Sequence, residues 1–470
     1  MRIVFVEPRG SDDNVFAKYL SLPLMGPIYL ATLLKQKGHQ AQCFNENLLG
    51  RSISDEELSS DILCITSLTL SIQRAYHLAS RYRSLNPNGK VIIGGIHASM
   101  LPEEAAQYAD YVFVGEGELQ IVDIVEKIAS NQQKTQIIRA DGLIDMDAVP
   151  TPDFSLLKNS HKMYMAPAIT SRGCPFDCNF CSVTQMFGKK YRMRSIPKVI
   201  QDIRAIKQKK IFFYDDNFSA IKSRTRDLLK AMKRNHINKK WTTQVRSDAA
   251  KDPKLIEQMA DAGCYTVYVG FESVNPETLK ELQKGQTPKE IRNAIRTFHD
   301  NSIEVHGMFM FGADADDKHT PKRTLNFCHD NDLDFAQFAI LTPLPGTGTF
   351  HQMEKAGRLL HKDWRYYEGL HVVFKPKLLT PYQLQQGMIE AFHDFYSYSR
   401  AINDSLNAVA DLSTVGIRAL YEKVQIPNFS AIAVRTAAKS LVSKWERQNQ
   451  EYLDFLHKIS IKTRLPKPQY

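Results

Sequence analysis

Long apolar runs are absent from this sequence. It contains no stretch of 18 apolar residues, whereas a membrane-spanning helix needs about 20. It also lacks a charged segment followed by an apolar one at its start, because Met1–Val6 already has the pattern of a buried strand. With 43% hydrophobic and 24% charged residues, the composition is typical of a soluble globular protein. We therefore expect a cytoplasmic protein of two or three domains, since 470 residues exceed one ordinary core.

Cysteine is scarce and unevenly placed. Four of the seven cysteines stand alone in apolar stretches, as small buried hydrophobic side chains do: Cys43, Cys64, Cys264 and Cys328. The other three form the pattern C-x3-C-x2-C, at Cys174, Cys178 and Cys181. Thiols spaced this densely in a reducing compartment indicate a metal or cluster site rather than disulfides.

A fourth ligand is missing near these three thiols. No other cysteine lies close in sequence, and no histidine stands at zinc-finger spacing. A cubane iron–sulfur cluster normally has four thiolate ligands, so three would leave one iron with an open coordination position. An open position is typical of a catalytic metal site. The alternative is a structural zinc site completed by Cys264 or by a remote histidine.

Acidic residues are in the minority. The chain has 61 Lys and Arg against 51 Asp and Glu, which gives a net charge of +10. This balance favours anionic partners, such as cofactor phosphates, nucleic acid or an anionic membrane surface. No basic stripe interleaved with aromatic side chains appears, so we do not expect nucleic-acid binding.

The first 130 residues alternate between strand-like and helical stretches. Apolar runs predict five strands, at Arg2–Glu7, Gln40–Asn45, Ile62–Ser67, Lys90–Gly94 and Tyr111–Gly115. This alternation predicts a flavodoxin-like, doubly wound parallel sheet whose ligand site lies at the carboxyl ends of the strands. Those ends are rich in glycine and hydroxyl side chains, which let a large ligand approach the backbone. The alternative is that Gly94, Gly95 and Gly115 only turn the chain out of the sheet.

The segment 131–164 is polar and then proline-containing, and we expect a linker that lies along the neighbouring domain. From 165 to 345, six strand candidates recur with helical stretches between them, which predicts a partial barrel of six βα units. We expect the remainder, 346–470, to be a mainly helical region. The six strand candidates are Ala166–Ser171, Lys210–Tyr214, Lys240–Val245, Cys264–Gly270, Ile303–Met310 and Phe335–Leu341.

Catalytic groups of such barrels lie at the carboxyl ends of the strands. The second end carries Asp215 and Asp216, which can bind a cation or an amino group, or cap a helix. The third end carries Arg246, whose guanidinium suits a carboxylate. The fourth end carries Glu272 and Ser273 in a G-x-E-S motif, which is weak when it stands alone.

The segment Gly173–Cys181 resembles the cluster-binding loop of the radical S-adenosylmethionine superfamily. The resemblance implies a [4Fe-4S] cluster on Cys174, Cys178 and Cys181, with its free iron chelated by the amino and carboxylate groups of S-adenosylmethionine. It also implies further contacts to that cofactor: Phe180 near the adenine, Asp215 and Asp216 near the methionyl amino group, Arg246 near the carboxylate, and Glu272 and Ser273 near the ribose hydroxyls.

The first domain resembles the cobalamin-binding domain that is fused to many radical S-adenosylmethionine enzymes, hopanoid methylases among them. It lacks the D-x-H-x-x-G motif whose histidine ligates cobalt in the mutase type. His97 is therefore expected to enter a helix or contact a phosphate rather than bind the metal. The resemblance implies that cobalamin contacts Ser67, Thr69, Gly94, Gly95, His97, Gly115, Glu116 and Gly117.

The resemblance implies an enzyme that makes a 5′-deoxyadenosyl radical and transfers a methyl group from cobalamin to an unactivated carbon of a lipid or secondary metabolite. It also implies an electron donor such as flavodoxin or ferredoxin. The alternative enzyme performs radical carbon–carbon coupling or cyclisation without binding cobalamin. A nonenzymatic electron carrier would normally fill all four ligand positions of its cluster. The basic region 401–470 either packs as a solvated helical face or contacts a membrane surface.

Overall fold

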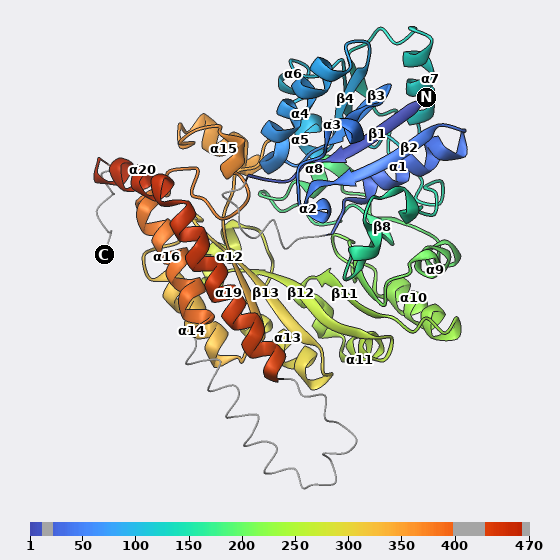
Figure 1. Cartoon of the computed structure of the whole chain (residues 1–470). Coiled ribbons are helices and arrows are strands. Elements are labelled where there is room, and N and C mark those ends of the chain that lie inside the picture. Colours follow the sequence, from blue (N-terminus) through green and yellow to red (C-terminus); the bar gives the residue numbers. More distant parts are fainter. Residues whose placement is uncertain (12–21, 398–427, 463–470) are drawn as a thin grey trace.

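The computed structural model describes residues 1–11, 22–397 and 428–462, and within 428–435 only the course of the backbone. Its first sheet is fully parallel, in the strand order β2-β1-β3-β4-β5-β6 (Figure 1). The five predicted strands are confirmed to within one residue. A sixth, β6, falls in the segment expected to be a linker. The strands are β1 (Arg2–Glu7), β2 (Gln40–Asn45), β3 (Ile62–Thr66), β4 (Lys90–Gly94), β5 (Tyr111–Val114) and β6 (Ile137–Arg139).

Helices cover both faces of this sheet. Alternate residues of β1 point to opposite faces: Ile3 and Phe5 join one hydrophobic cluster, and Val4 and Val6 join another. The predicted flavodoxin-like, doubly wound architecture is therefore confirmed. The helices are α1 (Met25–Gln36), α2 (Glu46–Leu49), α3 (Asp55–Leu58), η2 (Thr69–Ser71), α4 (Ile72–Leu85), α5 (Ile96–Met100), α6 (Pro102–Ala105) and α7 (Ile121–Ala129).

The connecting segment, which the sequence places along one neighbouring domain, contacts both of them. The backbone N–H of Asp153 donates to Thr32 on α1 across 3.1 Å, and Thr151 donates to Asp202 of the barrel across 2.7 Å. The segment therefore lies against the first domain and the barrel together. Besides β6 it holds two short turns, η3 (Phe154–Leu156) and η4 (Ser160–Lys162).

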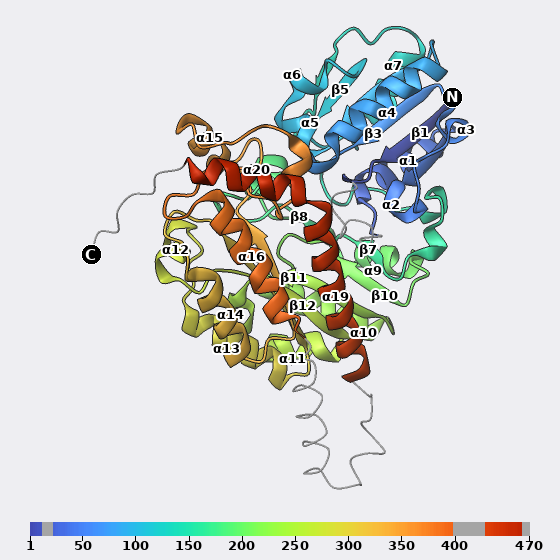
Figure 2. The same cartoon turned by 60° about the vertical axis from the view of Figure 1, so that its left-hand side comes forward.

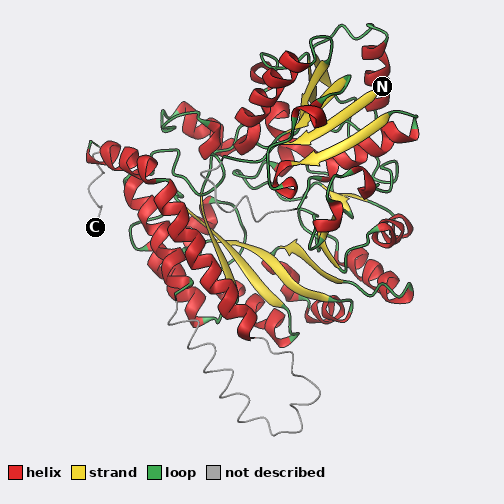
Figure 3. Cartoon of the chain, viewed as in Figure 1, coloured by secondary structure: helices red, strands yellow, loops and turns green. Residues whose placement is uncertain are grey.

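The second sheet is also fully parallel, in the order β14-β13-β12-β11-β10-β7. All six predicted strands are present, so the partial barrel is confirmed (Figure 3). They are β7 (Ala166–Ala168), β10 (Lys210–Phe213), β11 (Lys240–Val245), β12 (Cys264–Glu272), β13 (Glu304–Phe311) and β14 (Phe335–Ile340). Its helices are α8 (Val183–Phe187), α9 (Ile196–Ala205), α10 (Lys222–Arg234), η5 (Ser247–Lys251), α11 (Pro253–Asp261), α12 (Pro276–Glu281), α13 (Pro288–Asp300) and α14 (Thr320–Asp330).

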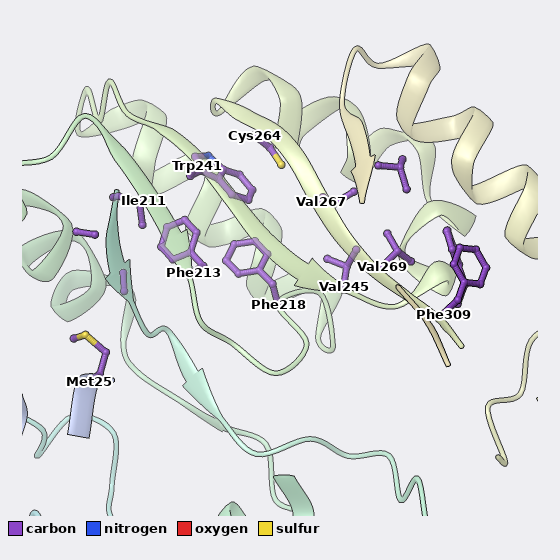
Figure 4. Close-up of a cluster of buried hydrophobic side chains, with 14 of the residues drawn as sticks. Met25, Ile211, Phe213, Phe218, Trp241, Val245, Cys264, Val267, Val269 and Phe309 are labelled. Atoms are coloured by element: carbon purple, nitrogen blue, oxygen red, sulfur yellow. The ribbon is translucent and has the colours of Figure 1, made fainter. Parts of the chain in front are cut away.

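An aromatic group anchors the core of this barrel (Figure 4). The rings of Phe213, Phe218 and Trp241 lie 5.2–5.4 Å apart, centroid to centroid. Trp241 is fully buried, and its indole N–H donates to the carbonyl of Ala262 across 2.8 Å. Because Phe218 follows the second strand end, this packing also fixes the loop that carries Asp215 and Asp216.

The C-terminal region is mainly helical, as predicted. Helices α16, α19 and α20 pack together along one side of the barrel (Figures 1 and 2). Helix α16 ends at Phe395, and residues 398–427 and 463–470 lie outside the described residues. Within the described ranges, no helix combines the length and hydropathy needed to span a membrane. The elements are α15 (Gly348–Lys355), η6 (Trp364–Tyr366), α16 (Pro381–Phe395), α19 (Asn428–Gln448) and α20 (Gln450–Ile461).

Candidate active site between the two sheets

The cysteine loop leaves a two-stranded antiparallel hairpin made of β8 (Ser171–Arg172) and β9 (Arg192–Met193). It begins at Gly173, whose φ is +84°. A Cβ there would lie 2.6 Å from the carbonyl oxygen of Lys190, so only glycine fits. The hairpin therefore fixes the point at which the loop starts, directly before its first thiol. We call residues 173–181 the cluster loop.

The three thiols of the cluster loop are reduced and partly exposed: Cys174, Cys178 and Cys181. Burial raises the pKa of Cys181 to about 11, and the charges of Cys178 and Cys174 add to this shift. The three thiols therefore lie within electrostatic reach of one another. A bound iron would favour the thiolate form that this environment otherwise disfavours. The other four cysteines are buried and not in disulfides, as predicted.

A cubane cluster fits this arrangement better than a single ion. Among the described residues, no three His, Cys, Asp or Glu side chains converge as the ligands of one metal ion do. In a cubane each thiolate binds a different iron, so the ligands surround a volume instead of meeting at a point. Three partly exposed thiols on one loop suit such a cluster, and the chain supplies no fourth cysteine beside them.

The two carboxylates at the second strand end have different surroundings. Asp215 is fully buried and accepts hydrogen bonds from the backbone N–H and hydroxyl groups of Thr170 and Ser171. It therefore holds the junction of β7 and β8. Asp216 accepts a hydrogen bond from the Gly173 N–H at 3.2 Å and lines a cavity. Burial, followed by the charge of Asp215, raises the pKa of Asp216 to about 6.

Arg246, at the third strand end, touches the cluster loop. Its guanidinium lies 3.8 Å from the ring centre of Phe176 and donates to the carbonyl of Lys284 across 2.7 Å. Its Nε is buried without a hydrogen-bond partner, and the nearest carboxylate oxygen, on Asp248, is 3.7 Å away. An unsatisfied buried donor of this kind suits a ligand carboxylate. Phe180, on the same loop, is partly buried and packs against the barrel core.

Glu272, at the fourth strand end, has an unusual backbone. Its φ is +61°, and a register irregularity between β12 and β13 accompanies it. Its carboxylate pairs with the buried ammonium of Lys284 across 2.6 Å. Ser273 is also buried, and its hydroxyl accepts the N–H of Asn275 across 3.0 Å. Strained backbone in a buried polar site is often functional.

A cavity of about 320 Å³ lies between the carboxyl edge of the first sheet and the hairpin that carries the cluster loop. One wall is apolar and comes from the first domain, with Met25, Leu30, Ile92 and Phe113 among its residues. The opposite wall includes Arg172, Met186, Phe187, Tyr214 and Asp216. None of the described residues that line it is a histidine. The apolar wall suits one face of a large macrocycle.

Five of the eight residues expected to contact cobalamin line this cavity: Gly94, Gly95, Gly115, Glu116 and Gly117. A Cβ on Gly95 would lie 2.5 Å from the carbonyl oxygen of Ser67, so this glycine also serves the turn, as the alternative interpretation held. Ser67, Thr69 and His97 are buried outside the lining. The His97 ring lies 3.3 Å from Glu104, and its other nitrogen has no partner. His97 also sits on α5, as predicted.

Glu116 belongs to a buried charge cluster that joins the two domains. It accepts hydrogen bonds from Arg172 at 2.7 Å and from Arg192 at 2.8 and 3.0 Å. Arg172 also pairs with Glu118 across 2.6 Å. Burial opposes ionisation of Glu116, but the hydrogen bonds of Arg192 and the charge of Arg172 outweigh it and lower the pKa. The charge cluster thus ties the wall of the cavity to the cluster loop.

Several of these residues were not predicted. Lys284 and Gln286 follow α12 in a Lys-Gly-Gln run, and Gln286 donates to the carbonyl of Phe271 across 2.6 Å. Arg172 and Arg192 are far from Glu116 in sequence, so only the folded hairpin reveals the pairing. The sequence does hold one signal for this pairing. An arginine stands on each side of the cluster loop, and an acidic Gly-Glu-Gly-Glu run occurs at 115–118.

Comparison with known proteins agrees with the division of the chain into a first domain and a barrel. The sequence model described as the Radical SAM superfamily matches residues 168–328, and that of the B12 binding domain matches residues 20–125. The chain is 31% identical to bacteriochlorophyllide d C-12(1)-methyltransferase of Chlorobaculum tepidum over 84% of this chain and 87% of that protein. It is 24% identical to the hopanoid C-2 methylase of Rhodopseudomonas palustris over 73% and 66% of the two chains.

Solved structures share the fold. The cobalamin-dependent radical enzyme OxsB, solved with aqua-cobalamin and S-adenosylmethionine, superposes with a TM-score of 0.67 at 13% identity, over 99% of this chain and 82% of that chain. The methyltransferase TsrM of Kitasatospora setae, solved with cobalamin and a [4Fe-4S] cluster, gives a TM-score of 0.64 at 16% identity, over 76% and 75%.

Proposed function

Because this chain belongs to the radical S-adenosylmethionine superfamily, in the group that carries a cobalamin-binding domain, we propose that it transfers a methyl group to an unactivated carbon of a lipid or secondary metabolite. The observation that carries the proposal is the cavity between the two domains. One wall is the glycine-rich carboxyl edge of a B12-binding sheet, and the other includes Ser171 and Arg172 of the hairpin that carries the cluster loop. A methyl donor and a radical generator have to meet at one substrate carbon, and this cavity joins their two sites.

When bound, the cluster, S-adenosylmethionine and cobalamin supply the electron, the radical and the methyl group, and the chain supplies position and a dry site. Cys174, Cys178 and Cys181 would hold three irons. The buried, unpartnered Nε–H of Arg246 would donate a hydrogen bond to the cofactor carboxylate, while Asp216 would face its amino group and Glu272 its ribose.

The relatives favour a ring-containing, largely apolar substrate. Their names describe methylation of a bacteriochlorophyllide and of hopanoids. The large apolar wall of the cavity agrees with such chemistry. We include an electron donor of the flavodoxin or ferredoxin type in the proposal, because a cluster that splits S-adenosylmethionine must be reduced in every cycle. Coupling or cyclisation without cobalamin would leave the apolar cavity without an occupant.

Anaerobic purification with cobalamin supplied tests the proposal. We expect about four irons and about one corrinoid per chain. With S-adenosylmethionine bearing a deuterated methyl group, the product should gain that label. Iron loading without any corrinoid uptake would overturn the methylase and would favour the coupling enzyme. Zinc in place of iron would overturn the assignment of the cluster loop.

A further inference from the structure

The chain that leaves the barrel after β14 reaches back to the first domain. Helix α15 lies beside α5 in both views (Figures 1 and 2). Phe350 and Trp364 from this part of the chain are buried in the same hydrophobic cluster as Val4 and Ile72 of the first domain. We call residues 346–367 the bridging segment. It is separate from the barrel strands and from the residues that line the cavity.

Two glycines at the start of the bridging segment touch two different cofactor-bearing parts. A Cβ on Gly346, whose φ is +82°, would overlap the sulfur of Met100 at the end of α5. A Cβ on Gly348 would overlap the side-chain oxygen of Asn179, which lies between the second and third cysteines. The backbone thus approaches the B12-binding domain on one side and the cluster loop on the other, so closely that a Cβ at either glycine would require Met100 or Asn179 to move.

Hydrogen bonds hold the contact with the cluster loop. The carbonyl of Asn179 accepts the N–H of Thr349 across 3.1 Å. The Asn179 side-chain amide donates to Gln352 on α15, also across 3.1 Å. The cluster loop is therefore docked on the first turn of α15, through one main-chain and one side-chain bond. A shift of α15 would move the backbone beside Cys178.

The far end of the bridging segment is attached to the edge of the cavity. The indole N–H of Trp364 donates to both oxygens of Glu104, at 3.0 and 3.1 Å. The same carboxylate bonds Tyr76 at 2.9 Å and lies 3.3 Å from His97, and the His97 ring meets Trp364 edge-on. His97 opens α5 two residues after Gly95, which lines the cavity. Trp364 therefore fixes the helix that follows this strand end.

We infer that the bridging segment sets the spacing between the two cofactors, with Gly348 and Trp364 as positioning residues. This inference rests on the proposed function, because only a methyl transfer between cofactors needs that spacing. The segment is the part of the described chain that contacts the Asn179 carbonyl at one end and the Glu104 carboxylate at the other. Neither positioning residue touches a cofactor site directly; each acts through the residue it contacts.

The test uses the full-length protein loaded with cluster and corrinoid. Gly348→Ala places a methyl group against Asn179, and Asn179→Ala removes the atom with which that methyl group collides. The double variant should restore what the first variant disturbs, with Asn179→Ala alone as the control. The direct readout is the electron–electron dipolar coupling between the reduced cluster and cob(II)alamin, which reports their distance. We expect a changed coupling in Gly348→Ala and, in the double variant, the value of Asn179→Ala alone, since both lack the bond to Gln352 and keep the bond from Thr349.

A second readout needs no substrate. Transfer of the methyl group of S-adenosylmethionine to the reduced corrinoid would release one S-adenosylhomocysteine per corrinoid, whereas 5′-deoxyadenosine requires only the cluster and S-adenosylmethionine. The ratio of the two products should fall about 10–100-fold in Gly348→Ala, since a misplacement of about 1 Å can cost 100-fold. The dissociation constant for corrinoid should stay within about twofold of wild type, because the cavity lining is unchanged.

Trp364→Phe tests the other end of the bridging segment, and it replaces Gly348→Ala as the test if that variant does not fold. It removes the N–H that bonds Glu104 and keeps an aromatic ring. Trp445→Phe is the matched control, because the buried indole nitrogen of Trp445 has no hydrogen-bond partner. The dipolar coupling should change in Trp364→Phe and not in Trp445→Phe. Unchanged coupling and product ratio in both Gly348→Ala and Trp364→Phe would overturn the inference. Failure of the wild type to bind corrinoid would instead overturn the proposed function.

Discussion

Arg172, two residues before Cys174, donates to Glu116 across 2.7 Å, and less than a tenth of either side chain is exposed to solvent. One partner belongs to the hairpin under the cluster loop and the other to the end of β5. A buried pair of this kind contributes little net stability, because desolvation offsets most of the attraction, but it specifies one arrangement of its partners. Here that arrangement is the placement of the cluster loop against the first domain.

Removing one charge of this pair should therefore lower the free energy of unfolding by far more than the intact pair adds to it. In Glu116→Gln, Arg172 and Arg192 remain buried with one carboxylate fewer, and we expect the free energy of unfolding to fall by about 3–5 kcal/mol. Urea denaturation of the apoprotein measures this. The control is Asp261→Asn, which breaks the exposed pair between Lys233 and Asp261 and should cost less than about 1 kcal/mol. Equal effects of the two substitutions would contradict the role of the charge cluster.

Substitution of a cysteine should affect iron binding only when that cysteine lies in the cluster loop. Cys178→Ala removes one cluster ligand, so iron should fall from about four per chain to near zero, and reductive cleavage of S-adenosylmethionine should stop. Cys264→Ala is the control, since Cys264 is buried on β12 and lies in the barrel core. It should keep its iron. Loss of iron in Cys264→Ala would instead indicate that Cys264 is a fourth ligand and that the cluster has no open position.

Most of the fold could be predicted from the sequence because its strands are long and buried. The predicted bounds of Lys240–Val245 match β11 fully. The strand β6 was missed because it has three residues, Ile137–Arg139, and follows a polar stretch. Strand β12 ends at Glu272 rather than at the predicted Gly270. Its pairing with β13 continues past a shift in register, and the hydrophobic periodicity of the sequence does not indicate such a shift.

The site was less predictable, for a physical reason. The thiols and the strand-end residues are local in sequence, so motif spacing finds them. Their partners are not: Glu116 lies 56 residues from Arg172. The backbone of Glu272 has a positive φ, which residue identity does not indicate for a glutamate. The matches to the Radical SAM and B12 binding models confirm the domains that the motifs predicted.

Glu7 gives the protein a defined response to pH. Burial raises the pKa of Glu7 to about 7, although its carboxylate accepts the N–H of Leu24 at 2.9 Å. The folded state therefore binds a proton more tightly than the unfolded state, and stability falls as pH rises from about 4.3 to 7. Glu7→Gln replaces the carboxyl group with a neutral group of the same shape and therefore removes this pH-dependent loss of stability. Its melting temperature should match that of wild type at pH 4.5 and exceed it at pH 8. A lower value at pH 8 would contradict this assignment.

Lys284 should matter for cofactor binding although no motif pointed to it. Its ammonium neutralises Glu272 across 2.6 Å, and its carbonyl accepts from Arg246. In Lys284→Met the buried carboxylate loses its partner, so it should become protonated or leave the position in which we propose that it binds the ribose. We expect the dissociation constant for S-adenosylmethionine to rise at least tenfold, which corresponds to about 1.4 kcal/mol. Lys280→Met, on the exposed face of α12, is the control and should bind normally. Unchanged affinity in Lys284→Met, with the protein folded and its cluster intact, would mean that Glu272 keeps its position without this partner.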